Sequence, residues 1–289
     1  MNWVNVIVQG VLLGGLYALF AAGLSLTFGV MRLVNLAHGD LSILAAFFCF
    51  TVADTLDVNP LLALILVLPA AFLFGYLLQR IVIEHVPRFD VLPAIVVTFG
   101  IGIIIENALL QEYSADNRRL LVGGLQTDTI KINEQLSVGV MPLLTFVAAI
   151  VVLGLLHLLL TRTQLGRAFR ATSDDPDAAR IVGVDHRRTF ALALAISIAT
   201  VALAGVLLGI RTSFTPFAGP ARLIFAFEAV IIGGLGSLWG TLAGGIILGV
   251  AQAIGAEIDP GYGVLAGHLV FLAVLVVRPT GLFGKVAAA

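Results

Sequence analysis

The sequence predicts an all-α fold, a polytopic bundle of membrane-spanning helices. Hydrophobic residues make up 60% of the 289 residues and charged residues 11%, and the mean hydropathy is +1.08. A soluble domain carries about 25% charged residues, so this chain is far too apolar to be one. Its apolar residues also form runs that mostly reach the length of about 20 residues that crosses a bilayer as a helix. We therefore expect a single domain over residues 1–289, embedded in a lipid bilayer.

Eight apolar runs define the expected helices. The first lacks the basic region and cleavage site of a secretory signal, so we interpret it as a transmembrane helix. The second has only about 14 residues and is expected to be tilted, embedded beside other helices or re-entrant. The seventh is too long for one span, and glycines from Gly233 to Gly240 mark its expected break. Eight or nine passages follow, from the runs 5–28, 40–53, 60–79, 92–110, 141–160, 189–210, 222–256 and 263–277.

A charged island at 161–188 is the strongest signal of orientation. It holds six of the sixteen Lys and Arg residues, and basic residues in short loops gather on the cytoplasmic side of membranes. We therefore place the island in the cytoplasm. Counting back through the runs puts the turn at 80–90 inside, and the segment 112–140 and the N-terminus outside. The C-terminal tail is expected inside if the glycine break is a true turn.

Two short helices are predicted within the island. The first covers Gln164–Ala171. The second has Asp175 as its N-cap, a proline at its first helical position, and Gly183 where a left-handed C-terminus is expected. Orientation alone would explain the arginines. A capped helix with Ala178 and Ala179 on its surface suggests more, a handle that a cytoplasmic motor protein grips.

The segment MRLVNLAHGD at 31–40 places four polar side chains in an apolar region. Unpaired polar groups cost on the order of several kcal/mol in hydrocarbon, so these must face protein, water or lipid headgroups. One interpretation is a plain interhelical turn with Gly39 as its hinge. The other is a broken helix whose backbone lines a translocation path, with Asn35 and His38 nearest to a solute or gate.

Glycines and two glutamates complete the candidate positions. Gly233, Gly234 and Gly236 begin a glycine series with repeated G-x-x-x-G spacing. This spacing predicts close helix packing, within the subunit or across a dimer, and also permits a flexible gate. Glu106 and Glu228 lie deep in predicted spans, where an ionisable group is a functional candidate. Interhelical structure and solute contact both remain open for them.

No catalytic motif is present in the sequence. It contains no Walker, dinucleotide-binding, H-E-x-x-H or G-x-S-x-G motif, so we expect neither an enzyme nor a cofactor. Cys49 is the sole cysteine, which excludes an internal disulfide and a cysteine-based metal cluster. The net charge of −1 and the pI near 6.5 give no basic surface for a nucleic acid.

Four blocks of sequence carry a resemblance to a known family. They are GLSLTFGVMRLVNLAHGDL at 23–41, GRAFRATSDDPDAARIVGVD at 166–185, IIGGLGSLWGTLAGGIILG at 231–249 and RPTGLFG at 278–284. Together they resemble the Liv-type permeases of bacterial branched-chain amino acid ABC importers. Four blocks in one order are specific to this family and less so to its substrate. The resemblance implies two cytoplasmic ABC ATPases, a sister permease in a heterodimer, and a periplasmic solute-binding protein as partners.

The resemblance implies ATP-driven import of branched-chain amino acids across the bacterial inner membrane, coupled through Asp174–Gly183. Urea, short amides or other amino acids are alternative solutes for the same architecture. An ion-coupled carrier would need paired buried carboxylates, and a non-transporting scaffold would leave the capped helix unexplained. The expected coupling residues are Arg167, Arg170, Asp174, Asp175, Pro176, Ala178, Ala179 and Gly183, and those of the translocation path are Asn35, His38, Gly39, Glu106, Glu228, Gly233, Gly234 and Gly236.

Overall fold

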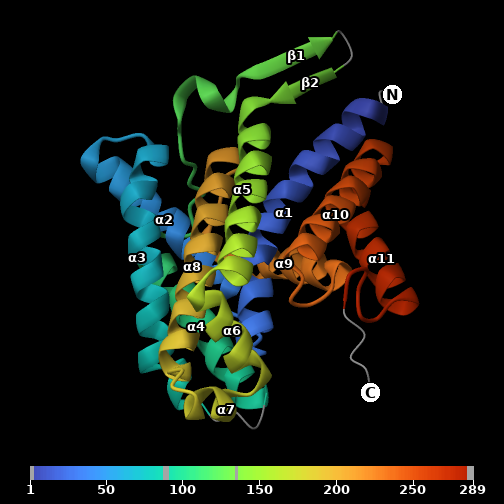
Figure 1. Ribbon diagram of the computed structural model, residues 1–289. Coiled ribbons are helices and arrows are strands. Elements are labelled where there is room, and N and C mark those ends of the chain that lie inside the picture. The colour runs from blue at the N-terminus through green and yellow to red at the C-terminus, as the bar shows by residue number, and fades with distance from the viewer. Residues whose placement is uncertain (1–2, 87–90, 134–135, 285–289) are drawn as a thin grey trace.

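The computed structural model describes residues 3–86, 91–133 and 136–284, so part of the predicted inner turn at 80–90 lies outside the described residues. Within them the chain is a helical bundle with one small sheet, which confirms the predicted fold class (Figure 1). Eight helices are long and apolar enough to cross a membrane, and α11 is a shorter apolar helix. The helices are α1 (Trp3–Met31), α2 (His38–Leu56), α3 (Pro60–Ile81), α4 (Val91–Tyr113), α5 (Val140–Arg162), α6 (Gln164–Asp174), α7 (Pro176–Ile181), α8 (His186–Arg211), α9 (Gly219–Gly233), α10 (Leu238–Ile258) and α11 (Tyr262–Val277), and the strands are β1 (Thr129–Asn133) and β2 (Leu136–Gly139).

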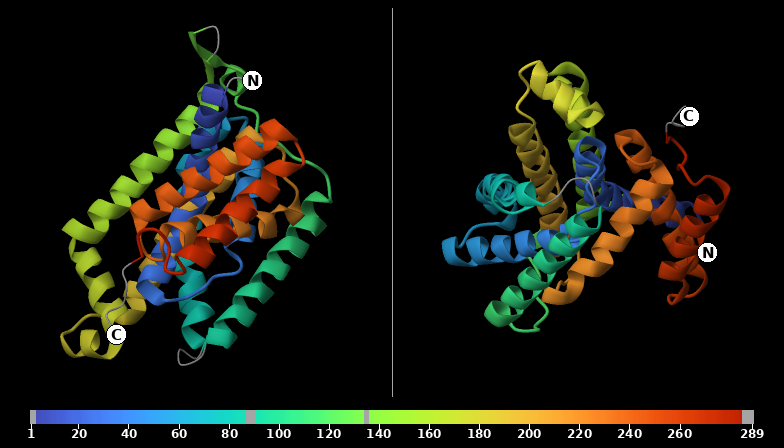
Figure 2. Two further views of the ribbon diagram at one scale, coloured as in Figure 1. Left: turned by 90° about the vertical axis from the view of Figure 1, so that its right-hand side faces the viewer. Right: turned by 90° about the horizontal axis from the view of Figure 1, so that it is seen from below.

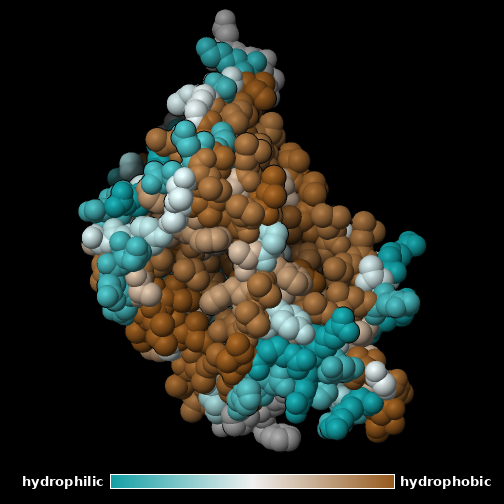
Figure 3. Space-filling view, turned by 90° about the vertical axis from the view of Figure 1, so that its left-hand side faces the viewer, coloured by the Kyte–Doolittle hydropathy of each residue, from teal (hydrophilic) through white to brown (hydrophobic). Residues whose placement is uncertain are grey.

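The two ends of the bundle carry different structures. The β1–β2 hairpin lies at the end where α1 begins, and α7 lies at the opposite end (Figure 1). The segments 112–140 and 161–188, predicted to lie on opposite sides of a membrane, are therefore far apart. Two hydrophilic patches are separated by a broad hydrophobic band on the surface (Figure 3). Such a band is the surface that lipid hydrocarbon requires.

Helices α1 and α8 form the core of the bundle. Helix α1 packs against α5, α8, α9 and α10, and α8 also packs against α2 and α3. Large side chains such as Phe20 and Leu194 are fully enclosed between them. Helices α4 and α5 lie at the periphery (Figure 2), where large apolar side chains such as Ile104 and Leu155 are exposed. The outward apolar faces are suited to lipid or to a second subunit.

The second apolar run forms a helix of spanning length. Helix α2 has 19 residues, because His38 and Gly39 extend the predicted run at one end and Asp54–Leu56 extend it at the other. Asp57 ends the helix in the left-handed conformation with φ of 50°. Asn59 then caps α3 by accepting a hydrogen bond from the Leu61 amide at 2.9 Å. The length of α2 removes the reason to expect a re-entrant segment here.

The seventh apolar run breaks where the glycines predict. Helix α9 ends at Gly233 and α10 begins at Leu238. Gly234 and Gly236 have φ values of 99° and 80°, a region that glycine adopts without the steric cost other residues meet. Ser237 then caps α10 by accepting a hydrogen bond from an amide of its first turn. The break is a tight turn between two helices.

The C-terminal block RPTGLFG completes the end of α9. The amides of Leu282 and Phe283 donate hydrogen bonds of 2.9 and 3.1 Å to the carbonyls of Ile232 and Gly233. The last carbonyls of a helix have no partner within that helix. Two sequence blocks nearly fifty residues apart therefore form one structural unit.

A glycine seam joins α1 to α10. Gly10 and Gly14 on α1 face Gly249 and Gly245 on α10, and a methyl group on Gly14 would lie 2.5 Å from the Ile246 Cα atom. Small residues spaced four apart allow two helix backbones to approach closely. The prediction of close packing from the G-x-x-x-G spacing is thus confirmed within this chain for Gly245 and Gly249.

The segment 112–140 folds back on the bundle. Strands β1 and β2 pair antiparallel, with Ile130 opposite Val138. The backbones of Arg118 and Phe214 exchange hydrogen bonds of 3.0 and 2.9 Å, which attach this segment to the chain after α8. The prediction of an all-helical chain missed this small hairpin because its strands have only five and four residues.

Substitution of Gly14 by alanine should destabilise the bundle, because the added methyl group would overlap the α10 backbone. Overpacking of this kind costs about 1–3 kcal/mol. The free energy of unfolding in detergent, followed by circular dichroism, measures the loss. Gly154→Ala on α5 is the matched control, since no atom lies within 4 Å of its added methyl group. Equal stability of the two variants would contradict the packing of the seam.

Candidate functional site

The α6–α7 hairpin, residues 164–181, forms the end of the molecule opposite the strands. Thr163 caps α6 by accepting a hydrogen bond from the Gly166 amide at 3.0 Å. Helix α6 continues to Asp174, three residues beyond the predicted end. Asp174 therefore closes the first helix and does not belong to the second.

Helix α7 has the caps that the sequence predicts. Asp175 Oδ1 accepts hydrogen bonds from the amides of Asp177 and Ala178 at 2.9 and 3.0 Å. Pro176 occupies the first helical position, where its missing N–H group has no partner to lose. Gly183 has φ of 87° and lies just beyond the helix. Both ends of this six-residue helix are therefore stabilised by local conformation.

The surface of α7 differs from the prediction in one respect. Ala178 is exposed, but Ala179 is only 3% exposed, so the expectation that both alanines lie on the surface is wrong. Ala179 faces the remainder of the protein because consecutive helical residues point about 100° apart around the helix axis. Ile181 and Val182 are instead 87% and 76% exposed. These two apolar side chains project from a charged loop, and the sequence patterns did not single them out.

The hairpin is anchored to the membrane helices by α6. Phe169 is buried among α1, α5 and α8. Arg170 donates a hydrogen bond to the Leu160 carbonyl near the end of α5, and Ser173 donates one of 2.8 Å to the Gly29 carbonyl in α1. Arg167 is exposed. A force applied to the hairpin therefore reaches the ends of two membrane helices directly.

Charged residues fix the start of α8 beside α3. Arg187 and Arg80 both lie 3.2 Å from carboxylate oxygens of Glu84. Asp185 caps α8, and the amides of Arg188 and Arg187 that donate to its carboxylate hold the pKa of this carboxyl below its ordinary value. Burial opposes this effect only in part, because the side chain is exposed.

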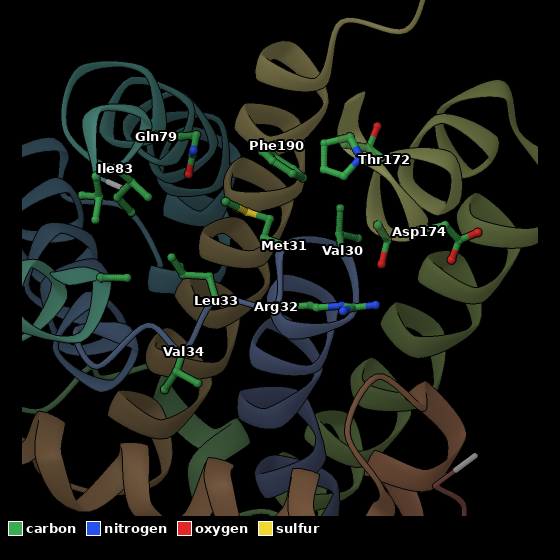
Figure 4. Close-up of a pocket in the computed structure, with 14 residues that line it drawn as sticks. Val30, Met31, Arg32, Leu33, Val34, Gln79, Ile83, Thr172, Asp174 and Phe190 are labelled. Carbon is green, nitrogen blue, oxygen red and sulfur yellow. The ribbon is translucent and has the colours of Figure 1, made fainter. Parts of the chain in front are cut away.

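A cavity of about 380 Å³ lies between the end of α1, the end of α3 and the end of α6. Arg32 extends toward the side where Thr172 and Asp174 lie, and Gln79 lines the opposite side (Figure 4). The cavity therefore joins the helix break at 32–37 to the C-terminal turn of α6. Two regions that the sequence suggested separately, the polar block and the coupling loop, meet here.

Asn35 and His38 are buried inside the protein. Asn35 is 1% exposed and accepts a hydrogen bond from the Ala37 amide at 3.0 Å. His38 is fully buried and donates from Nε2 to the Phe20 carbonyl at 2.9 Å. Both side chains thus stabilise the break between α1 and α2. Each also keeps one nitrogen without a hydrogen-bond partner among the described residues, Asn35 Nδ2 and His38 Nδ1.

Gly39 is not a hinge. It lies in the first turn of α2, and a methyl group there would collide with the carbonyl of Gly219 on α9. Its role is close packing, because a larger residue would push two helices apart. Asp40 follows it and is 6% exposed. The Asp40 carboxylate lies against Gly102 on α4, where an added methyl group would be 2.5 Å from Asp40 Oδ2, and Glu106 is about one helical turn further along α4.

Glu228 is 3% exposed and forms a short hydrogen bond with His268 Nδ1. The bond joins α9 to α11, about forty residues apart in the sequence. Gly233, Gly234 and Gly236 lie in the α9–α10 turn described above. The structure thus separates the predicted path residues into two groups. One surrounds the start of α2 and the other lies along α9.

A family model described as the branched-chain amino acid transport system permease component matches residues 6–277. The chain belongs to this permease family. A similar protein is the high-affinity branched-chain amino acid transport system permease BraD of Pseudomonas aeruginosa, 31% identical over 98% of this chain and 96% of that protein.

Two further relatives show how far the similarity of the permease extends. The permease LivH of the corresponding system in Escherichia coli is 29% identical over 96% of this chain and 94% of that protein. The fructose import permease FrcC of Rhizobium meliloti is 35% identical over only 45% of this chain and 39% of that protein. No solved structure matches the chain. The family is a transport component, so the permease is not an enzyme.

Replacement of Asp175 by alanine should loosen the start of α7, because two amides lose their acceptor. Loss of an N-cap costs about 0.5–2 kcal/mol. Hydrogen exchange at Asp177 and Ala178 should accelerate accordingly. Asp177→Ala is the control, since its side chain makes only the weaker interaction with the helix dipole. Unchanged exchange in Asp175→Ala would contradict the cap.

Acidification should loosen the start of α8. The pKa of Asp185 is lower in the folded protein than in the unfolded chain, so its stabilising effect is complete above the ordinary carboxyl pKa of about 4 and is lost as the pH falls through the lower folded value. Hydrogen exchange of the Arg187 and Arg188 amides, corrected for its intrinsic pH dependence, reports the change. The variant Asp185→Asn keeps a capping oxygen and should lose this pH dependence.

Proposed function

We propose that the permease is the membrane subunit of an ATP-driven importer for branched-chain amino acids in the bacterial inner membrane. Its partners are two cytoplasmic ATPases, a sister permease and a periplasmic binding protein that delivers the solute. Family membership supports the transport role. The observation that carries the proposed coupling is the exposed pair Ile181 and Val182 at the tip of α7, a helix with fixed ends.

The coupling step follows from the anchoring of the hairpin. ATP binding draws the two ATPases together, and a groove on each one holds the apolar tip of an α7 helix. Side chains of α6 donate hydrogen bonds to carbonyls of α5 and α1. Displacement of α7 therefore also displaces the ends of these two helices. The adjoining cavity provides the space for the 32–37 segment to rearrange. The membrane helices then open toward the opposite side of the membrane.

The choice of solute has two supports. The relatives BraD and LivH match over nearly their whole length and carry names of branched-chain amino acid systems, whereas the fructose permease matches over less than half of the chain. The spanning helices are also mainly apolar, which suits a zwitterion with an aliphatic side chain. Urea, short amides and other amino acids remain the solutes that the test must separate.

An ion-coupled carrier shares one feature with this structure. Asp40 on α2 and Glu106 on α4 place two acidic residues on helices that pack together within the predicted spans. Family membership favours the ATP-driven mechanism instead. Leucine uptake by this subunit alone, driven by an ion gradient, would contradict the proposal.

Substitution of Ile181 and Val182 by serine should weaken ATPase binding by about tenfold or more, because truncated apolar anchors at an interface commonly have this effect. Co-purification of the ATPases from membranes measures the loss. Leu121→Ser is the matched control, since Leu121 is 71% exposed and does not belong to the α6–α7 hairpin. Ala178→Arg should also weaken binding, whereas Ala179→Arg should disturb the hairpin itself because Ala179 is buried. Unchanged co-purification of the serine variant would remove the assigned role of α7.

The solute is tested with the complete transporter. Proteoliposomes that contain both permeases and the ATPases should accumulate leucine, isoleucine and valine when the binding protein and ATP are supplied. The same amino acids should raise the melting temperature of the binding protein, and urea should not. Uptake of urea or amides without uptake of branched-chain amino acids would assign the transporter to the alternative solutes.

A further inference from the structure

Four helices bring polar side chains together beside α9 in an otherwise apolar region. Tyr17 on α1 donates a hydrogen bond of 2.5 Å to Gln252 Oε1 on α10. Glu228 on α9 is bonded to His268 on α11. Gln252 also lies against Gly267, the neighbour of His268. We call Tyr17, Arg222, Glu228, Gln252 and His268 the α9 cluster.

Arg222 joins this cluster from the first turns of α9. Arg222 is three positions before Phe225, so the two side chains are neighbours on the surface of α9. Phe225 in turn packs against the Tyr17 ring. Arg222 and Glu228 are six positions apart, which separates their Cα atoms by about 9 Å along the helix. Phe225 lies halfway between them.

Several polar atoms of this region have no partner within the described part of the chain. Two are hydrogen-bond donors, Arg222 Nε and Gln252 Nε2. The third is an acceptor, Glu228 Oε2. Buried polar atoms in folded proteins nearly always have partners, so donors and an acceptor left unpartnered in one region make it a candidate binding site. These atoms are complementary to the head group of an α-amino acid. The donors can bind its carboxylate, and the acceptor can bind its ammonium group.

Aromatic rings supply a place for an aliphatic side chain. The Phe225 ring centre lies 5.1 Å from that of Tyr17 and 6.2 Å from that of His268, and it is stacked with the His268 ring. The row of three rings runs between the arginine end and the glutamate end of the cluster. An aliphatic side chain gains from contact with such rings.

We propose that the α9 cluster is a site that holds the zwitterionic head of an amino acid during its passage. Arg222 and Gln252 bind the carboxylate, Glu228 binds the ammonium group, and Phe225 contacts the side chain. Tyr17 and His268 are positioning residues that hold Gln252 and Glu228. The inference rests on the proposed function and adds to it the chemical feature that the passage recognises. A neutral amide or a sugar would leave the fixed charges of the site without partners.

The test uses the complete transporter in proteoliposomes, with leucine uptake and ATP hydrolysis measured in the same sample. Glu228→Gln keeps a side chain that can bond to His268, and it should lower leucine uptake per ATP hydrolysed by about tenfold because the ammonium group loses its charged partner. Arg222→Gln should have a similar effect, and Arg222→Lys should restore most of the uptake. The controls Glu112→Gln and Arg278→Gln change exposed charges elsewhere and should leave uptake unchanged.

A second measurement needs no variant and covers the case in which a substitution prevents assembly. A leucine analogue with a diazirine in its side chain is delivered to the wild-type transporter and activated by light. We expect attachment to one of the four helices of the cluster, α1, α9, α10 or α11, and competition by leucine but not by leucinamide, which lacks the carboxylate. Attachment only to helices outside these four would overturn the site.

The outcomes separate this inference from the proposed function. Wild-type uptake of leucine with equal uptake in Glu228→Gln and Glu112→Gln would overturn the site and leave the importer intact. No leucine uptake by the wild-type transporter would overturn the proposed function, and the site with it. Reduced uptake per ATP in both Glu228→Gln and Arg222→Gln, with recovery in Arg222→Lys, would support the site.

Discussion

Lipid hydrocarbon offers no hydrogen bonds, and the breaks between the helices of this protein are built around that constraint. Between α1 and α2, the Asn35 side chain accepts from the Ala37 amide and Thr98 accepts from the Leu36 amide. Between α9 and α10, the amides of Leu282 and Phe283 donate to the end of α9. At each break, some hydrogen-bond partners of the backbone come from residues elsewhere in the chain. These contacts fix the position of the break in the fold.

The same constraint divides the buried polar side chains into two kinds. His38 bonds to the Phe20 carbonyl and Ser197 to the Gly23 carbonyl, so these groups tie helices together at known positions. The α9 cluster is different because two of its atoms without partners among the described residues, Arg222 Nε and Glu228 Oε2, belong to side chains of opposite charge. Hydrogen bonds between helices hold the bundle together. Unpartnered groups of opposite charge are instead suited to binding a molecule that enters and leaves.

The hairpin of α6 and α7 lies outside the hydrocarbon and follows other rules. Here water satisfies open backbone groups, so the caps of α7 serve to fix its shape. Ser173 and Arg170 then bind this shape to α1 and α5. A short capped helix with exposed apolar side chains at its tip transmits force better than a flexible loop, because a capped helix deforms less under that force.

The sequence by itself determined the class of the fold, the break at Gly234 and Gly236, and the caps at Asp175 and Gly183, because each of these depends on length, on local conformation or on neighbours a few residues away. Only the tertiary structure decided that Gly39 packs against α9, that Ala179 is buried, and that Glu228 pairs with His268. These facts depend on residues far apart in the chain. The pattern of a single helix cannot show which neighbour it will face, and packing settles that choice.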